Sequence, residues 1–308
     1  MSSFTELALP VLPATGFCAL PHLSVIAARG PEAALFLHNQ LTQDFLLLGM
    51  QHARLAAFCN AKGRMQASLV GFKTSEEEVL LVIRADLLSQ TLKRLSMFVL
   101  RAKVKLTDAS AEWTVNGRLA ALTEKPAPWQ LSREKDSWSV SLYPAAGLVR
   151  SLLISPSIAP VQNQGLSIDD WLLSDVLSGI GDVQAATFEA FVPQMLNYES
   201  VDGVNFKKGC YPGQEVVARS QFRGILKRRT YIASSALPLQ AGQEIFNSTD
   251  ASQPAGQVVQ SVSHPQHCHW ALVCLQTAST ETGDLHPADT TGSVLRLHPL
   301  PYALRDDI

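Results

Sequence analysis

The most informative part of the chain, residues 205–224, reads NFKKGCYPGQEVVARSQFRG. A single cysteine, Cys210, follows two lysines and a glycine, and a short turn separates it from the start of a predicted helix at Gln214. A thiol close to a cation and to a helix N-terminus is favoured in its thiolate form, which is the reactive form of the group. The pattern therefore predicts a reactive thiol, while a small buried hydrophobe is the equally common alternative for a free cysteine.

The predicted helix carries its charges on one face. Glu215, Arg219 and Arg223 lie at i, i+4 and i+8, and each Glu–Arg pair in this order stabilises a helix by roughly 0.2–0.5 kcal/mol. Residues 227–229 add Lys-Arg-Arg, so the region is a basic patch on a chain with a net charge of −2. A solvated charged face is the common interpretation. The sharper alternative is an anion site for a carboxylate, a polyglutamate tail or a phosphate.

Composition indicates a globular protein without a membrane span. The chain has 308 residues, 46% of them hydrophobic and 17% charged, which suits a substantial core divided over about two or three domains. Glu6 is the first charge and Arg29 the first arginine, and no apolar run approaches the ~20 residues of a membrane helix. We therefore expect a cytoplasmic protein with no DNA or membrane partner, in which any RNA contact would have to use the local basic patch.

The cysteines do not form a recognisable framework. There are five, the number is odd, and no two have the C-x-x-C spacing, which argues against disulfides and against a cysteine-held zinc or iron–sulfur site. One compact group of potential ligands remains, namely His264, His267, Cys268 and His269. Pro265 and the adjacency of three of these side chains suit a loop better than a tetrahedral site, so we expect no metal.

Periodicity predicts a mixed α+β body followed by a β-rich tail. Helices are expected after Pro31, with a stripe of Ala34, Leu37 and Leu41, from a cap at Asp86, with a face of Leu88, Leu92, Leu95 and Val99, and from a Ser167–Asp170 capping arrangement to Leu177. Strands are expected at 55–59 and 65–72, joined by a turn at 60–64, and at 79–83, 104–106, 113–115 and 138–142, with a loop at 124–128. The tail has short strands near 229–233, 257–262, 270–275 and 294–297, which is typical of a small β-barrel.

At the opening stretch the chain resembles a known family. Residues 208–215, KGCYPGQE, are similar to the K-G-C-Y-x-G-Q-E signature of the YgfZ-type folate-binding proteins, which are relatives of the glycine cleavage T-protein, an aminomethyltransferase. Four further segments also look like the family: 193–197, 203–206, 60–65 and 299–302. The resemblance extends from about residue 17 to residue 302.

The resemblance implies both a fold and a function. The expected fold is an α+β, T-protein-like ring of three lobes around a central folate cavity, with a C-terminal β-barrel. The implied domains are a folate-binding body over 1–222 and a barrel over 223–308, and the body divides into one lobe of 1–50 plus 163–222 and another of 51–162. The implied ligand is tetrahydrofolate or a folate derivative. The implied setting is support of the synthesis or repair of iron–sulfur enzymes, which would be the client proteins, and thereby of tRNA modification.

The family motifs also suggest site residues. Cys210 would be the key thiol and Lys208 its cationic neighbour. The residues suggested for folate binding are Trp171, Gln194, Asn197, Tyr211, Glu215 and Arg223, and those that complete the motif are Gly209, Gly213, Gln214 and Arg219. An aromatic ring such as that of Trp171 could stack on a pterin, although a core-facing helix residue is the plain alternative.

The residues that T-proteins use as acids are replaced here. By the resemblance, the positions of their Asp-Asp pair correspond to Ala67 and Ser68, and a later glutamate corresponds to Leu177, so none of these side chains can serve as a carboxylate acid or base. Leu23 stands where the family has a second tryptophan. Two hypotheses therefore stay open: a folate-dependent accessory enzyme that uses Cys210 and Lys208, and a non-enzymatic accessory protein for iron–sulfur enzymes. An aminomethyltransferase is a third and weaker one.

Overall fold

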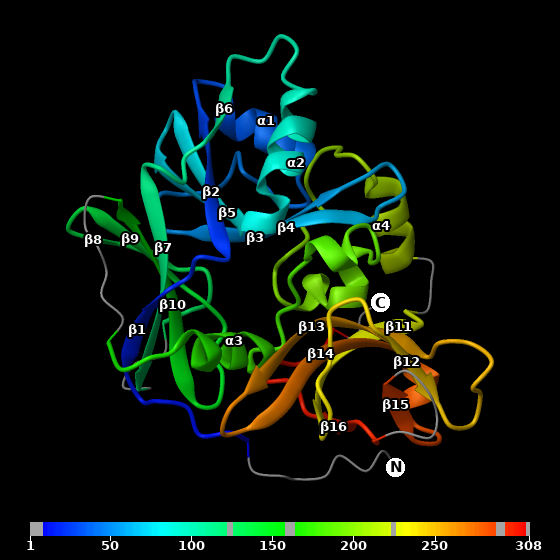
Figure 1. Cartoon of the computed structure of the whole chain (residues 1–308). Coiled ribbons are helices and arrows are strands. Elements are labelled where there is room, and N and C mark those ends of the chain that lie inside the picture. The colour runs from blue at the N-terminus through cyan, green and yellow to red at the C-terminus, as the bar shows by residue number, and fades with distance from the viewer. Residues whose placement is uncertain (1–8, 122–125, 158–163, 223–225, 288–292, 306–308) are drawn as a thin grey trace.

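Three antiparallel sheets lie around a central region of the molecule (Figure 1). The structure is a computed structural model that describes residues 9–121, 126–157, 164–222, 226–287 and 293–305. Helices and strands are mixed along the chain, as the α+β prediction requires. No helix in this part of the chain is long and apolar enough to cross a membrane.

The first sheet has the order β3-β4-β5-β2-β6 and carries two helices. Its strands are β2 (Leu23–Arg29), β3 (Ala53–Cys59), β4 (Met65–Ser75), β5 (Glu78–Arg84) and β6 (Lys105–Asp108). Helix α1 (Ala33–Gln40) contacts β5, and α2 (Ala85–Ser96) packs against β2 and β6 through Leu87, Thr91 and Leu95. Strands β2 to β5 are buried over most of their length because the helices and the rest of the molecule cover them, whereas the edge strand β6 is exposed or half-buried.

The second sheet has the order β1-β7-β10-β9-β8 and takes its edge strand from the start of the chain. It contains β1 (Gly16–Ala19), β7 (Trp113–Ala121), β8 (Leu131–Glu134), β9 (Ser137–Ser141) and β10 (Leu148–Pro156). Because β1 pairs with β7 while β2 belongs to the first sheet, the chain crosses between the two sheets near residue 20. Helix α3 (Ile168–Leu177) follows and lies between the second sheet and the C-terminal sheet (Figure 1).

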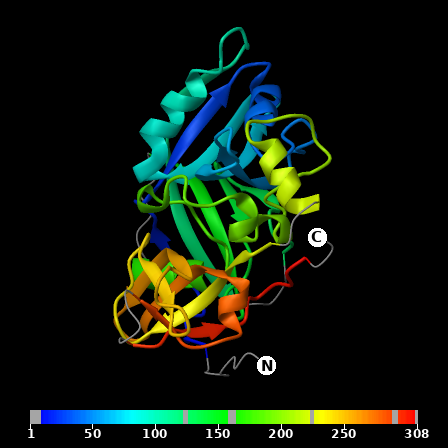
Figure 2. The ribbon, with the colours of Figure 1, turned by 90° about the vertical axis from the view of Figure 1, so that its right-hand side faces the viewer.

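The C-terminal sheet curls into a half-barrel with its own small core (Figure 2). Its order is β15-β12-β13-β14-β11-β16. The strands are β11 (Arg228–Ser235), β12 (Glu244–Asn247), β13 (Gly256–His264), β14 (Cys268–Gln276), β15 (Leu285–Pro287) and β16 (Arg296–His298), with the short helix η4 (Thr277–Thr280) after β14. The barrel expected from the tail is therefore found as a curled, half-closed sheet.

Short helices connect the sheets between α3 and the C-terminal sheet. They are η1 (Ala185–Thr187), η2 (Pro193–Leu196), η3 (Tyr198–Ser200) and α4 (Gln214–Phe222). Backbone hydrogen bonds join this segment to the first sheet, from Met65 to the carbonyl of Phe191, and to the connection between α1 and β3, from Asn205 to the carbonyl of Thr42. The segment that contains the opening motif is thereby anchored beside the first sheet.

Most of the predicted elements are confirmed, with errors in the buried faces of two helices. In α1 the buried face includes Ala33, Phe36 and Leu37, while Ala34 of the predicted stripe is only partly buried. The helix expected from a cap at Asp86 begins at Ala85, so Asp86 lies in its first turn and does not cap it. Its buried face is formed by Leu87, Thr91 and Leu95, one position away from Leu88 and Leu92. Strands β1, β2, β8, β10, β12 and β15 were not predicted, and residues 124 and 125 of the expected loop lie outside the described residues. The proposed lobe boundaries stay a prediction.

Candidate functional site

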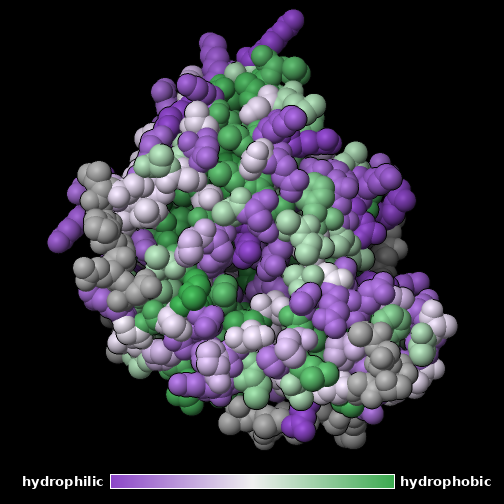
Figure 3. Space-filling model, in the orientation of Figure 1, coloured by the Kyte–Doolittle hydropathy of each residue, from purple (hydrophilic) through white to green (hydrophobic). Residues whose placement is uncertain are grey.

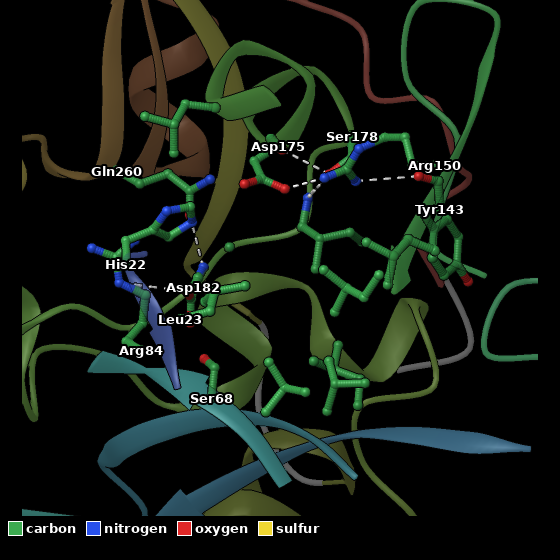
Figure 4. A pocket seen from close by; sticks show the side chains of 18 of the residues that line it. His22, Leu23, Ser68, Arg84, Tyr143, Arg150, Asp175, Ser178, Asp182 and Gln260 are labelled. Atoms are coloured by element: carbon green, nitrogen blue, oxygen red, sulfur yellow. Dashed lines mark hydrogen bonds and ion pairs between the residues drawn. The ribbon is translucent and has the colours of Figure 1, made fainter. Parts of the chain in front are cut away.

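A cavity of about 120 Å³ lies where the three sheets meet. Figure 3 shows a hollow near the centre of one face, bordered by hydrophilic and hydrophobic residues. The walls of the cavity come from the first sheet, the second sheet, α3, the segment after α3 and the C-terminal sheet, and include Ser68, Arg84, Arg150, Trp171, Asp175, Asp182 and Gln260 (Figure 4). Because every part of the fold contributes a wall, the cavity depends on the complete chain.

Trp171 forms part of the wall, but little of its surface is open. Its exposed fraction is 1%, and the guanidinium carbon of Arg150 lies 4.8 Å from the centre of its ring. Gly117 of β7 packs so closely on the ring that a Cβ atom there would come within 2.3 Å of it. In this conformation the indole is therefore mainly a packing element of the wall, with little of the ring available to stack on a ligand.

Arg150 is a buried charge with a complete set of partners. Its Nε donates to Ser174 Oγ at 2.9 Å and its Nη1 to the carbonyl of Tyr143 at 3.3 Å, while Nη2 pairs with Asp175. Burial raises the pKa of Asp175, and the Arg150 cation offsets part of this rise. A buried charge needs such a set of partners to offset its desolvation. Arg150 therefore fixes α3 to the second sheet.

Asp182 presents a second carboxylate to the cavity, next to Arg84. The Arg84 Nε lies 4.0 Å from Asp182 Oδ2 and 3.5 Å from Asp86 Oδ1. Burial raises the pKa of Asp182 to about 7, and the Arg84 cation opposes this rise. A carboxyl group that titrates near neutral pH can act as a donor or as an acceptor. The cavity thus holds an acidic group of the kind expected to be missing from it.

Most of these polar residues cannot be recognised from local sequence patterns. Asp175 follows Trp171 by four residues, so helix spacing could have placed both on one face of α3. Arg84, Asp182 and His22 come from separate segments, and no local pattern joins them. Burial lowers the pKa of His22 to about 4, so this cavity histidine is neutral at physiological pH.

The residues that correspond to functional positions of T-proteins differ in whether they line the cavity. Ser68 lies in the cavity wall and accepts hydrogen bonds from Tyr198 Oη at 2.6 Å and from the backbone N–H of Val183 at 3.1 Å. Leu23 also lines the cavity, whereas Ala67 and Leu177 are buried and do not. The cavity therefore has a hydroxyl at the position of one T-protein acid, and its carboxylates come from other positions.

The KGCYPGQE motif lies apart from the central cavity. None of the described residues of the motif, 207–215, lines the central cavity. Lys208 is buried, and its ammonium donates to the carbonyls of His38 and Leu41 at the C-terminal end of α1, the latter at 2.9 Å. Burial lowers the pKa of Lys208 to about 8. Tyr211 packs beneath it, with the Lys208 Nζ 4.5 Å from the ring centre.

Cys210 lies exposed between these two buried residues. It precedes the first residue of α4, Gln214, by four positions and therefore lies outside the first turn of that helix. Gly213 supplies the left-handed turn, with φ of +82°, and packs against the turn at 60–63, where a Cβ atom would come within 2.4 Å of the Asn60 carbonyl. Gly209 is exposed beside Cys210. The motif is thus a rigid loop that presents its thiol to the outside.

The other predicted site residues have clear surroundings in the structure. Gln194 is buried, and its Nε2 donates to the carbonyl of Val217 in α4 at 2.6 Å. Asn197, also buried, donates to the carbonyl of Thr230 at 2.9 Å and so ties the body to the C-terminal sheet. The Glu215 side chain is 84% exposed and pairs with Arg219 at 2.7 Å. Arg223 lies outside the described residues. Of the residues suggested for folate, Trp171 is therefore the one found in the wall of the cavity.

The histidine-rich group near residue 267 belongs to the hairpin between β13 and β14. His264 Nε2 lies 3.1 Å from Asp170 Oδ1 at the start of α3, and its ring stacks on His267 with centres 4.7 Å apart. His269 Nδ1 contacts Ser263 Oγ at 2.8 Å. These contacts join the C-terminal sheet to α3.

Comparisons with known proteins agree with this fold. The chain is 28% identical to the tRNA-modifying protein YgfZ of Photorhabdus laumondii over an alignment of 329 positions, which covers 99% of this chain and 98% of that protein. It is 30% identical to an uncharacterised protein of Haemophilus influenzae, which covers 80% and 84% of the two chains. The glycine cleavage aminomethyltransferase T of Bartonella henselae has a similar structure, with a TM-score of 0.64 and 15% identity over 95% of this chain and 87% of that one.

No protein-family model matches the chain. The matches to the relatives nevertheless cover most of both sequences, and the T-protein structure has a similar fold. Together with the KGCYPGQE signature at residues 208–215, they show that the chain belongs to the YgfZ-type family.

Proposed function

We propose that this protein binds tetrahydrofolate or a related reduced folate in its central cavity, and that it supports the iron–sulfur enzymes that modify tRNA. The observation that carries the proposal is the cavity where the three sheets meet, in a fold shared with an aminomethyltransferase T. Relatives that match nearly the whole chain are named tRNA-modifying proteins, which supports the setting.

The donors of the cavity fit a folate. The Nε atom of Arg84 is buried and has no hydrogen-bond partner among the described residues, and its carboxylate neighbours, Asp86 and Asp182, lie 3.5 and 4.0 Å away. A buried N–H donor without a hydrogen bond is costly, and an oxygen atom on a bound ligand would relieve that cost. The walls also include Trp129, Tyr143 and several aliphatic residues, which suit the flat apolar face of a pterin.

Cys210 is proposed as the key thiol, with a macromolecular partner as its target. The thiol is exposed and lies outside the cavity wall, so it is open to another protein but does not face a ligand in the cavity. Lys208 holds the loop that carries it. The accessory function would thus use two places, a folate cavity inside the molecule and a thiol on its surface.

A folate-dependent one-carbon transferase is the alternative. It is favoured by the carboxylates of Asp175 and Asp182 in the cavity, and disfavoured by Ala67, Ser68 and Leu177 at the acid positions of T-proteins. Formation of methylenetetrahydrofolate from an aminomethyl donor and tetrahydrofolate would distinguish the transferase from the accessory protein.

Titration with tetrahydrofolate tests the proposal. We expect saturable heat in calorimetry and quenching of tryptophan fluorescence in the wild type. The quenching should fall in Trp171→Phe, because that ring lies in the wall, and should persist in Trp113→Phe, a half-buried tryptophan that does not line the cavity. Neither heat nor quenching in the wild type would remove folate from the account.

A further inference from the structure

Two side chains of opposite charge stand together in the wall of the central cavity. Arg84 ends β5, and Asp182 follows α3 by five residues. The Asp182 side chain is 33% exposed, and both side chains are among those that line the cavity (Figure 4). Their atoms Nε and Oδ2 are 4.0 Å apart, which is an ion-pair distance and too long for a hydrogen bond. Arg84 Nε also lies 3.5 Å from Asp86 Oδ1, and Asp182 has Ser68 as a hydrogen-bonding neighbour. Because no hydrogen bond joins Arg84 to Asp182, each side chain can still contact a third group.

The backbone at Asp182 is held from two sides, so its position is fixed. Its N–H donates to Gln260 Oε1 of the C-terminal sheet at 2.9 Å. The next N–H, of Val183, donates to Ser68 Oγ of the first sheet at 3.1 Å, and that hydroxyl also accepts from Tyr198 at 2.6 Å. A side chain placed by such a network is suited to orient a ligand, because it loses little freedom on binding.

We propose that Arg84 and Asp182 bind the lactam edge of a heterocycle, an N–H next to a C=O, with the guanidinium donating to the carbonyl and the carboxylate accepting from the N–H. The inference rests on the proposed folate function and names the part of the ligand that this site reads, since the pyrimidinone ring of a pterin carries such an edge. A donor and an acceptor side by side match this edge and mismatch a ring that presents an amino group and a bare nitrogen instead.

The charged and titratable groups around Asp182 make this binding depend on pH. They are Arg84 on β5, Asp86 on α2, Asp175 on α3, and the hydroxyl of Tyr198 on η3. Burial raises the pKa of Asp182 to about 7, and His22, on the cavity wall, is already neutral there, with its pKa lowered to about 4. A ligand N–H prefers the ionised carboxylate, so binding should strengthen as pH rises through about 7.

Three measurements of binding test the inference. The wild type should bind tetrahydrofolate about tenfold more weakly at pH 6 than at pH 8, because the ionised fraction of a group with a pKa near 7 changes by that factor. Asp182→Asn should bind about 10- to 100-fold more weakly at pH 8 and lose the pH dependence. The wild type should prefer pterin to 2,4-diaminopteridine, which lacks the lactam edge, and the variant should lose that preference.

Asp136→Asn is the matched control, because Asp136 is an exposed carboxylate in the turn between β8 and β9. If Asp182→Asn fails to fold, as judged by circular dichroism, Arg84→Gln tests the same edge from the donor side and should also lose the preference for pterin. Equal affinities and equal pH profiles in Asp182→Asn and Asp136→Asn would overturn the inference and leave folate binding intact. Absence of tetrahydrofolate binding by the wild type would overturn the proposed function, and the inference with it.

Discussion

Lys208 and Cys210 are two residues apart and have opposite surroundings. The ammonium of Lys208 is buried on the carbonyls that end α1, where a cation is favoured by the helix dipole. The sulfur of Cys210 is exposed. Lys208 therefore stabilises the loop by binding backbone, and the loop in turn presents the thiol to a partner. This arrangement assigns the two most prominent residues of the motif different tasks.

Cys210→Ala should abolish support of iron–sulfur enzymes in cells and leave the fold unchanged. An exposed side chain contributes little to stability, so the free energy of unfolding, measured with urea, should change by no more than about 0.5 kcal/mol. The readouts are the level of modified nucleosides in tRNA, by mass spectrometry, in a strain that depends on the variant, and the unfolding curve. Cys268→Ala is the control, because Cys268 is also exposed but lies on the hairpin between β13 and β14. Normal tRNA modification with Cys210→Ala would end the proposed role of the thiol.

Helix α3 shows how one element serves both stability and the cavity. Ser167 Oγ accepts from the N–H of Asp170 at 3.0 Å, and Asp170 Oδ2 accepts from the N–H of Ser167 at 3.1 Å, which completes a capping box. The other oxygen of Asp170 contacts His264 on the C-terminal sheet. The cap therefore sets the start of the helix, and with it the places of Trp171 and Asp175 in the cavity wall.

Ser167→Ala should lower the free energy of unfolding by about 1 kcal/mol, because the N–H of Asp170 loses its acceptor. Urea unfolding followed by circular dichroism measures the change. Ser132→Ala is the matched control, since Ser132 is an exposed serine of β8 for which the structure shows no side-chain hydrogen bond. A loss no larger than that of the control would show that the capping box does not stabilise the helix.

The sequence predicted what local patterns encode and missed what distant residues build. The spacing of Ser167 and Asp170 predicted the start of α3, and two apolar runs joined by a turn predicted β3 and β4, because caps and hairpins depend on near neighbours. Strand β10 was missed, although it forms the longest described ladder with β7, because its buried Arg150 finds Asp175 25 residues later. The cavity was predicted from family resemblance, and the pair of Arg84 and Asp182 became visible only in three dimensions.

Tyr302, near the end of the described chain, joins three parts of the molecule. Tyr302 Oη donates to the carbonyl of Gly179 at 2.7 Å and accepts from Asn197 Nδ2 at 3.3 Å, and its ring meets that of Tyr143 edge-on, with centres 5.6 Å apart. Arg229 pairs with Glu199 nearby, at the junction of η3 and the C-terminal sheet. These contacts join the segment after α3, the second sheet and the C-terminal sheet at one point.

Tyr302→Phe should destabilise the protein by about 1–2 kcal/mol, because it leaves the buried carbonyl of Gly179 without its donor while the ring contacts remain. Thermal or urea unfolding measures the loss. In the control, Tyr143→Phe, the hydroxyl that is removed makes no hydrogen bond to a described residue, so the change should be smaller. Equal losses in the two variants would show that the hydrogen bond from Tyr302 to Gly179 adds no stability of its own.

This late closure has a consequence during synthesis. Asn197 and its partner Tyr302 are 105 residues apart, so the amide leaves the ribosome long before the hydroxyl that it binds. At roughly 5–20 residues per second, the interval is about 5–20 s. During that time the segment after α3 lacks its contacts with Tyr302, and the apolar surface that they cover is exposed. A nascent chain of this protein should therefore be a substrate for ribosome-associated chaperones until residue 302 has emerged.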